Sequence, residues 1–270
     1  MGFMSVRTVA SVCAVCALSV AAVAGEHPWK GKHVAFLGDS ITDPNQRNEI
    51  YWQCLERDIG IVPHVYAVSG YQWDRIYPMA QRLFSEQGGS IDAIVILLGT
   101  NDFNSGVPLG EWDEVRREDV YRRGETLNSS RRHPIMDMTT FRGRINTVMG
   151  YLKSHFPEQQ IVLMTPVHRG YAKFDEKNVQ PSECFANKQE LYLEDYVQAL
   201  REAADRFSVP LIDLYRDSGL LPSDSAYARY FRGGGANDNL HPNTLGHRRI
   251  ARVMAERLRT LPPDFKSLSK

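Results

Sequence analysis

The sequence has no excess of charge of either sign. Its 270 residues carry 32 Lys and Arg against 32 Asp and Glu, so the formal net charge is zero. Without a broad basic field the chain has no evident means of holding nucleic acid, and we expect no such partner. The sequence also lacks a zinc-type spacing of Cys and His, a P-loop and a GxGxxG run after a predicted strand. It therefore predicts neither a bound metal nor another cofactor.

Cysteine is scarce as well. Cys13 and Cys16 lie in the N-terminal segment, which leaves Cys54 and Cys184 in the rest of the chain. An exported protein can hold a disulfide, but spacing in the sequence says nothing about the distance between two cysteines in space. A disulfide between Cys54 and Cys184 and two free buried thiols both stay open.

The first 24 residues read as a secretory signal peptide. Arg7 gives a basic start, an apolar stretch runs over residues 9–24, and the letters AVA at 22–24 fit the cleavage pattern of small residues. The apolar stretch is about the minimum length for a membrane span, so an uncleaved anchor is the alternative. We predict cleavage before Gly25, a periplasmic or secreted protein, and no stable membrane insertion after cleavage.

The rest of the chain, residues 25–270, is expected to form one domain. The sequence is 43% hydrophobic and 24% charged, which suits a globular domain with a sizeable core. Strands are predicted over His33–Leu37, His64–Val68, Ala93–Leu98, Gln160–Thr165 and Pro210–Leu214. Helices are predicted over Glu49–Ile59, Arg75–Gln87, Thr140–His155, Asn187–Phe207 and Thr244–Leu258. Strand followed by helix five times predicts an α/β fold, with a five-stranded parallel sheet covered by helices on both faces.

Polar residues and glycines follow three of these predicted strands. Gly38-Asp39-Ser40 follows the first, Ser69-Gly70 the second and Gly99-Thr100-Asn101-Asp102 the third. Ligands of such sheets bind beyond the carboxyl ends of the strands, so these residues are expected on one rim. Ser40 is then a candidate nucleophile, and the Gly70 N–H and the Asn101 amide are candidate donors to an oxyanion.

A serine nucleophile needs a base, and the base needs an orienting group. Asp238 and His241 stand three residues apart near the C-terminus. On a tight turn the carboxylate can fix the imidazole tautomer and leave Nε2 free to take the serine proton. Taken alone, this spacing also occurs as a helix cap or a surface pair.

Together, the blocks around Ser40, Gly70, Asn101 and Asp238-x-x-His241 resemble those of the SGNH hydrolases, also called GDSL esterases and lipases. The resemblance covers nearly all of the chain after residue 24, in order. It implies a three-layer α/β/α fold of flavodoxin-like type, with Ser40 as nucleophile, His241 as base and Asp238 as its partner. It also implies an oxyanion hole built from the Ser40 and Gly70 N–H groups and the Asn101 side chain. The second block departs from the family pattern, because residues 67–69 lack the asparagine that often precedes its glycine.

Two segments, Phe103–Asp137 and the shorter Val167–Ala186, do not fit the pattern of strands and helices; we expect them as loops, and they leave the substrate open. Phe103 to Asp137 is charged and rich in arginine, which is typical of a solvated face or of a flap over the site. Candidate substrate-binding residues follow predicted strand ends, and core packing is the alternative for the aromatic ones; they are Tyr71, Trp73, His168, Arg169 and Tyr171.

We expect an exported serine esterase acting on O-acyl esters, most simply acetyl esters of carbohydrate. The first alternative is a lysophospholipase or thioesterase, which the polar Phe103–Asp137 segment does not favour. The second is an inactive carbohydrate-binding protein on the same scaffold, which the presence of all four catalytic-type residues does not favour. The sequence leaves the oligomeric state open.

Overall fold

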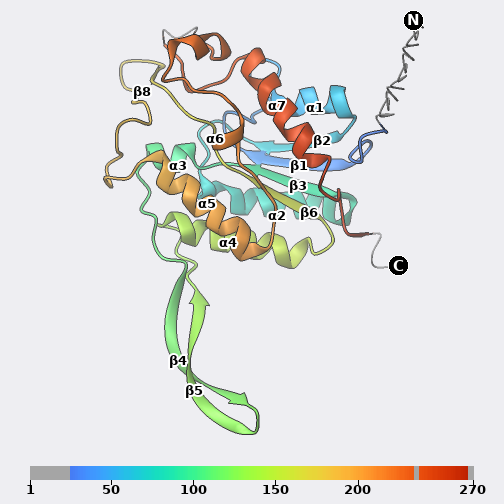
Figure 1. Ribbon diagram of the computed structural model, residues 1–270, viewed down its shortest axis with the longest axis vertical. Helices are drawn as coiled ribbons and strands as arrows, with labels where there is room; N and C mark the ends of the chain where they lie inside the picture. Colours follow the sequence, from blue (N-terminus) through green and yellow to red (C-terminus); the bar gives the residue numbers. More distant parts are fainter. Residues whose placement is uncertain (1–24, 234–236, 267–270) are drawn as a thin grey trace, which may run out of the picture.

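The protein is built around a parallel sheet between two layers of helices (Figure 1). The computed structural model describes residues 25–233 and 237–266. The strands of the sheet are β1 (His33–Gly38), β2 (Val62–Ala67), β3 (Ala93–Leu97), β6 (Gln160–Met164) and β9 (Leu211–Ile212). Their order is β2-β1-β3-β6-β9, and every neighbouring pair is parallel. This is the flavodoxin-like order, so the predicted three-layer α/β/α fold is confirmed.

Helices cover both faces of the sheet. One layer contains α1 (Tyr51–Ile59) and α7 (Thr244–Leu258), and the other contains α2 (Ile76–Gln87), α4 (Phe141–His155) and α5 (Leu193–Phe207) (Figure 1). The shorter elements are α3 (Thr100–Asn104), α6 (Leu214–Asp217), 3-10 turns at Trp73–Arg75, Gly88–Ser90 and Ser225–Tyr230, and the strand pair β7 (Ala172–Lys173) and β8 (Val179–Gln180).

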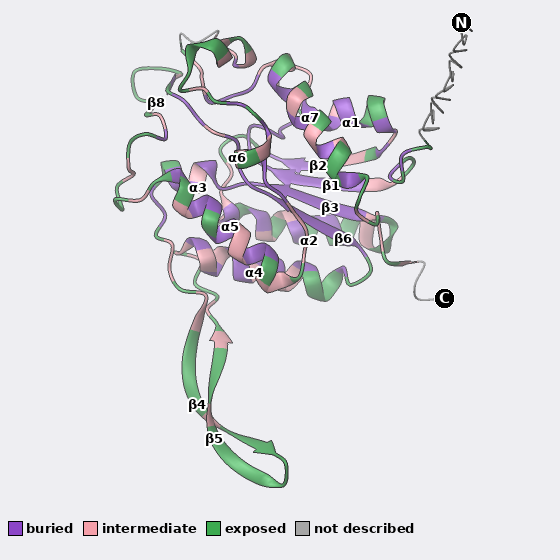
Figure 2. Cartoon of the chain, viewed as in Figure 1, coloured by how far each residue is buried: buried purple, intermediate pink, exposed green. Residues whose placement is uncertain are grey.

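Both faces of the sheet are buried (Figure 2). Successive side chains of a strand point to opposite faces. In β1, Ala35 and Leu37 belong to the hydrophobic cluster shared with α2, α4 and α5, whereas Val34 and Phe36 belong to the cluster shared with α1 and α7. Each face therefore needs apolar residues, which is why the central strands read as unbroken apolar runs in the sequence.

Four predicted boundaries differ from the structure by more than one residue, namely the starts of α1, β2 and α5 and the end of β9. Two of these differences have identifiable reasons. Strand β2 begins at Val62 rather than His64, because β2 is an edge strand and tolerates Pro63. Helix α5 begins at Leu193 rather than Asn187. The Asn187 side chain accepts hydrogen bonds from the N–H groups of Gln189 and Leu191, at 2.9 and 3.3 Å, so the chain turns there before the helix starts.

The segment expected as a long loop is mostly a β-hairpin. Strands β4 (Asp113–Arg122) and β5 (Glu125–Pro134) pair in antiparallel register and project from the body as an arm that is exposed almost throughout (Figures 1 and 2). Arg123 and Gly124 both have positive φ, 52° and 91°, as a two-residue hairpin turn requires. Sequence patterning missed the hairpin because neither of its faces packs on a core, so no hydrophobic alternation marks it.

The two cysteines of the described chain do not pair with each other. Cys54 is buried and Cys184 is exposed, and both are free thiols. Residues 1–24, on which the predicted signal peptide falls, lie outside the described residues. Within residues 25–233 and 237–266, no helix is long and apolar enough to span a membrane.

Candidate active site

Three side chains from the two ends of the chain form a continuous line of hydrogen bonds. The Ser40 hydroxyl lies 2.9 Å from His241 Nε2, and His241 Nδ1 lies 2.9 Å from Asp238 Oδ2. Ser40 follows the carboxyl end of β1, and the turn with Asp238 and His241 precedes α7. The structure thus brings together the three residues that the sequence singled out as nucleophile, base and orienting acid.

The Asp238 carboxylate is fixed by its own turn. Its Oδ1 accepts hydrogen bonds from the N–H groups of His241 and Leu240, at 2.9 and 3.2 Å. Burial raises the pKa of Asp238, but these bonds and the His241 side chain outweigh burial and hold the pKa below its ordinary value. Asp238 therefore stays ionised at neutral pH and can hold His241 Nδ1 as the protonated ring nitrogen.

The turn that presents Ser40 is tightly packed. A Cβ atom on Gly38 would lie 2.4 Å from Thr42 Oγ1 and 3.2 Å from the Leu97 carbonyl oxygen, so only glycine fits at the end of β1. Asp39 is buried, and its Oδ1 accepts the Ile41 N–H at 3.0 Å. Burial raises the pKa of Asp39 to about 7, although that N–H opposes the shift. Gly38 and Asp39 thus shape the turn that holds Ser40.

Candidate oxyanion donors lie beside Ser40. Gly70 has φ of 84° in the turn from Val68 to Tyr71, closed by a 3.1 Å bond from the Tyr71 N–H to the Val68 carbonyl. Within the described chain, the N–H groups of Ser40 and Gly70 donate to no acceptor. Asn101 Nδ2 donates one hydrogen to the Tyr71 carbonyl at 3.0 Å, which leaves its second amide hydrogen for a ligand. Ser40, Gly70, Asn101 and His241 line the same cavity.

Asp43 connects the Ser40 turn to the Gly70 turn, and the sequence analysis missed it. Asp43 Oδ2 accepts hydrogen bonds from the N–H and the hydroxyl of Ser69, at 2.8 and 2.7 Å. Burial opposes ionisation of Asp43, but its hydrogen bonds from Ser69 and Asn45 hold its pKa below the ordinary value. Ser69 lies next to Gly70, so this contact fixes Gly70 relative to Ser40 without the asparagine of the family pattern.

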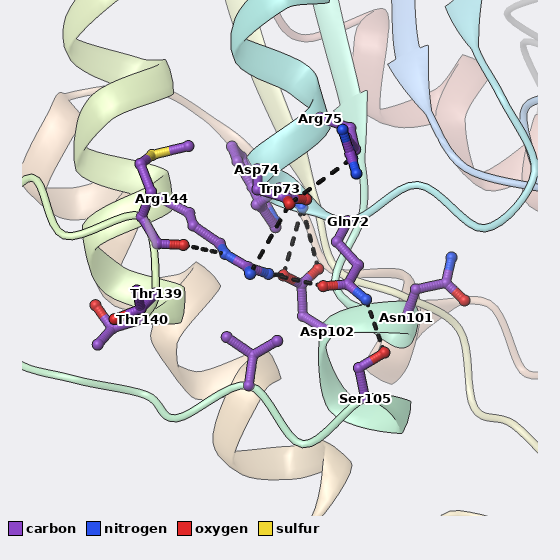
Figure 3. A network of polar contacts seen from close by, with 12 residues as sticks. Gln72, Trp73, Asp74, Arg75, Asn101, Asp102, Ser105, Thr139, Thr140 and Arg144 are labelled. Atoms are coloured by element: carbon purple, nitrogen blue, oxygen red, sulfur yellow. Dashed lines mark hydrogen bonds and ion pairs between the residues drawn. The ribbon is translucent and has the colours of Figure 1, made fainter.

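A second network, made of hydrogen bonds and an ion pair, fixes the helix α3 that carries Asn101 (Figure 3). Asp102 is fully buried and forms an ion pair with Arg144 Nη1 at 2.8 Å. Arg144 Nη1 also donates to Gln72 Oε1 at 2.8 Å, and the Trp73 N–H donates to Asp102 Oδ2 at 3.2 Å. Burial raises the pKa of Asp102 to about 7, opposed by the charge of Arg144. The network joins α3, which carries Asn101, to α4 and to the segment after Gly70.

The Ser40 hydroxyl faces a cavity of about 390 Å³. The rest of its lining comprises five polar side chains, Gln46, Ser69, Asn178, Gln180 and Arg232, and two apolar ones, Phe174 and Leu240. Phe174 lies with its ring centroid 5.4 Å from that of His241. Within the part of the chain that the structure describes, no group of three or more His, Cys, Asp and Glu side chains is arranged to hold a metal ion.

Comparison with known families agrees with this geometry. The sequence profile of the GDSL-like lipase/acylhydrolase family matches residues 36–249, which include Ser40, Asn101, Asp238 and His241. The chain belongs to this family. It is accordingly a hydrolase of ester bonds, and the resemblance noted in the sequence is confirmed. A comparison with curated protein sequences gave no match.

Solved structures share the fold of this GDSL-family hydrolase. A protein from Lactobacillus plantarum is 26% identical, with a TM-score of 0.64 over 85% of this chain and 97% of that one. A lipase/acylhydrolase from Enterococcus faecalis is 15% identical, with a TM-score of 0.51 over 84% and 95%. A catalytic mutant of Axe2, an acetylxylan esterase from Geobacillus stearothermophilus, is 15% identical, with a TM-score of 0.51 over 85% and 94%. At 15% identity these likenesses concern the fold alone.

The residues expected to contact substrate lie outside the cavity of this hydrolase. Trp73 is fully buried and packs in the hydrophobic core, which is the alternative that the sequence left open for the aromatic residues. Arg169 is also buried. Its guanidinium donates to the Thr100 carbonyl of α3 at 3.1 Å and to Gln180 Oε1 of β8 at 2.7 Å, so it stabilises the position of α3. The expectation that these two side chains line the sugar site is therefore corrected.

The other three expected contacts have different roles. His168 Nδ1 lies 2.5 Å from Glu183 Oε1, and its ring packs 3.7 Å from that of Tyr215, measured between centroids. Tyr71 contributes to the active site through its backbone, because its carbonyl oxygen accepts the hydrogen bond from Asn101 Nδ2. Tyr171 is partly exposed, and its carbonyl accepts the Asn239 N–H at 2.9 Å. None of the three is among the cavity-lining residues of the described chain.

The neighbouring histidine, His247, is not placed to act as the base. It is fully buried in α7, and its ring packs on Tyr51 with 6.3 Å between centroids. Within residues 25–233 and 237–266, neither of its ring nitrogens has a hydrogen-bond partner. Burial, together with the charges of Arg232 and His241, lowers the pKa of His247 to about 3, so the ring stays neutral as part of the core.

Proposed function

We propose that this protein is an exported serine esterase that hydrolyses O-acyl esters, most simply O-acetyl esters of carbohydrate. The observation that carries the proposal is the unbroken line from Ser40 Oγ to His241 Nε2 and from His241 Nδ1 to Asp238, with both bonds 2.9 Å long. Serine attack with an imidazole base requires this arrangement. The export part of the proposal depends on the sequence of residues 1–24.

In the first half of the reaction His241 Nε2 takes the Ser40 proton while Oγ attacks the ester carbonyl. Negative charge develops on the carbonyl oxygen, where the N–H groups of Ser40 and Gly70 and the free amide hydrogen of Asn101 can donate. The intermediate collapses to an acyl-Ser40 ester, and the departing alcohol takes the proton from His241.

In the second half water attacks the acyl group while His241 again accepts the proton. Collapse of this intermediate releases the carboxylic acid and returns the proton to Ser40 Oγ. One ester and one water thus give one acid and one alcohol. Asp238 stabilises the imidazolium in both halves, since its carboxylate remains ionised.

The lining of the cavity supports a short acyl group and a polar alcohol. Amide and hydroxyl side chains from Gln46, Ser69, Asn178 and Gln180 outnumber the apolar Phe174 and Leu240. These side chains are partly bonded to one another and to Arg169, and a long acyl chain would cover their remaining amide hydrogens and oxygens without offering partners, which is costly. The acetylxylan esterase Axe2 acts, by its name, on an acetylated polysaccharide. Its likeness to this chain concerns the fold alone.

A panel of p-nitrophenyl esters and acetylated polysaccharides tests the proposal. We expect turnover of p-nitrophenyl acetate and acetate release from an acetylated glycan, with far slower turnover of the palmitate ester. Ser40→Ala is the matched control and should release no acetate. A preference for palmitate would favour a lipid acyl hydrolase, and glycan binding without hydrolysis would favour the inactive binding protein.

A further inference from the structure

Arg232 lies on the wall between two neighbouring cavities. The first is the 390 Å³ cavity that contains Ser40 and His241. The second, of about 360 Å³, is lined by Asn45, Gln46, Arg47, Asn48, Arg232 and Asn243. Arg232 and Gln46 belong to both linings, so a ligand whose ester lies at Ser40 can extend past these two side chains into the second cavity.

The two linings are positively charged. Among the described residues, both cavities together contain Arg47 and Arg232 but no Asp or Glu. The nearby acidic groups are engaged elsewhere: Asp238 with His241, Asp43 with Ser69 and Asn45, and Glu49 with Arg57 and Arg248. A ligand that crosses from one cavity to the other therefore meets two cations and no carboxylate, which favours a negatively charged ligand.

The guanidinium of Arg232 has unused hydrogen-bonding capacity. Its Nε and Nη2 atoms are covered by protein and have no acceptor among the residues that the structure describes. These two atoms form one edge of the guanidinium, and a carboxylate can accept from such an edge with both oxygens. A covered donor without an acceptor is destabilising, so this side chain gains more from an anionic ligand than a surface arginine does.

The main chain holds Arg232 close to the base. The Arg232 N–H donates to the His241 carbonyl at 3.1 Å, and the neighbouring Phe231 pairs with Pro242 across an isolated bridge. Burial lowers the pKa of Arg232 below its usual value while Asp238 opposes the shift, and the group stays charged at neutral pH. The backbone of Arg232 is thus fixed beside the His241 turn, and its side chain lines the cavity that contains Ser40.

We propose that Arg232 selects esters whose alcohol part carries a carboxylate, as an O-acylated uronic acid does. The inference rests on the proposed esterase function, because it places the scissile ester at Ser40. Because Nε and Nη2 are covered by protein in the structure, the proposal requires a change in the side-chain torsions of Arg232 that turns this edge toward the ligand. Gln46 and Arg47 line the second cavity, into which the same sugar extends. A neutral sugar ester would leave the guanidinium edge unpaired.

The test compares two substrates that differ only in charge: an O-acetylated methyl galacturonoside and the corresponding uronamide. For the wild type, kcat/KM on the uronate should exceed that on the uronamide by about tenfold or more, a typical scale for one charge-assisted pair. Arg232→Gln should bring this ratio close to one, and Arg232→Lys should leave part of it. Arg252→Gln, which removes an exposed charge from α7, should keep the wild-type ratio.

A second measurement separates failure of this inference from failure of the esterase function. Ser40→Ala should bind the uronate at least about tenfold more tightly than the uronamide in calorimetry, and the double variant Ser40→Ala/Arg232→Gln should not. Hydrolysis of both substrates at one rate, or equal binding of the two, overturns the role of Arg232 and leaves the esterase intact. Selective binding without hydrolysis of any ester supports Arg232 and overturns the esterase.

Discussion

Asp43 Oδ2 accepts two hydrogen bonds from Ser69, one from its N–H at 2.8 Å and one from its hydroxyl at 2.7 Å. The contact joins two segments that follow different strands of the sheet, β1 and β2. One segment carries the Ser40 hydroxyl and the other carries the Gly70 N–H. The distance between the proposed nucleophile and one proposed oxyanion donor thus depends on a single buried carboxylate.

Removal of that carboxylate should impair the chemical step. We expect Asp43→Ala to lower kcat by roughly 10–100-fold with a smaller change in KM, because a displaced Gly70 N–H stabilises the transition state less. Ser69→Ala keeps the backbone bond and should cost less. The comparison needs kcat per titrated active site, and a wild-type kcat in Asp43→Ala would show that the two turns hold their places without it.

Asn101 should act on rate rather than on stability. Asn101→Ala is expected to lower kcat by roughly 10²–10³ with little change in KM, the cost typical of one oxyanion donor. Asn101→Asp should be slower still, since a carboxylate repels the developing charge. If Asn101 only fixes the turn at Tyr71, the alanine variant will instead lose about 1 kcal/mol of stability and keep its turnover per titrated site.

The buried Asp39 should make stability depend on pH. Its pKa is raised to about 7 in the folded protein and is about 4 in an unfolded chain, so between these values the folded state holds a proton that the unfolded state has lost. Stability should therefore fall as pH rises from about 4 to 7, by up to about 1.4 kcal/mol per unit.

The variant Asp39→Asn removes this titration. Relative to the wild type, its free energy of unfolding should rise across the same window and then level off above about pH 7. Denaturant titrations at pH 4.5, 6 and 8 would measure the difference. A difference in the free energy of unfolding that does not change between pH 4.5 and 8 would contradict the raised pKa of Asp39.

The β4–β5 arm should be dispensable for small substrates, because none of its residues lines the Ser40 cavity. Val115 and Arg132 lie opposite each other, so the residues between them can be replaced by an Asn-Gly turn. Asp113, which pairs with Arg206, remains. We expect kcat/KM for p-nitrophenyl acetate to stay within about twofold of the wild-type value, since the lining is unchanged. A loss of turnover per titrated site would mean that the arm acts on the site.

The sequence was informative about those features whose physical cause produces a recognisable pattern of residues. The doubly covered strands showed as apolar runs, Ser40 and Asn101 showed as polar residues at strand ends, and Asp238 and His241 showed as an acid and a histidine three residues apart. Sequence analysis failed for Trp73 and Arg169, because a residue after a strand can turn inward as easily as outward. It missed Asp43 and the Asp102–Arg144 pair because their partners are 26 and 42 residues away in sequence, and only folding brings them together.

The central claim is that Ser40 is the nucleophile, activated by His241, and covalent labelling tests it most directly. A fluorophosphonate should add one label per molecule, and peptide mass spectrometry should place it on Ser40. Ser40→Ala should take no label and show no esterase activity, His241→Ala should label far more slowly, and His247→Ala, if it folds, should keep labelling. A label on another residue, or wild-type turnover by Ser40→Ala, would contradict the account.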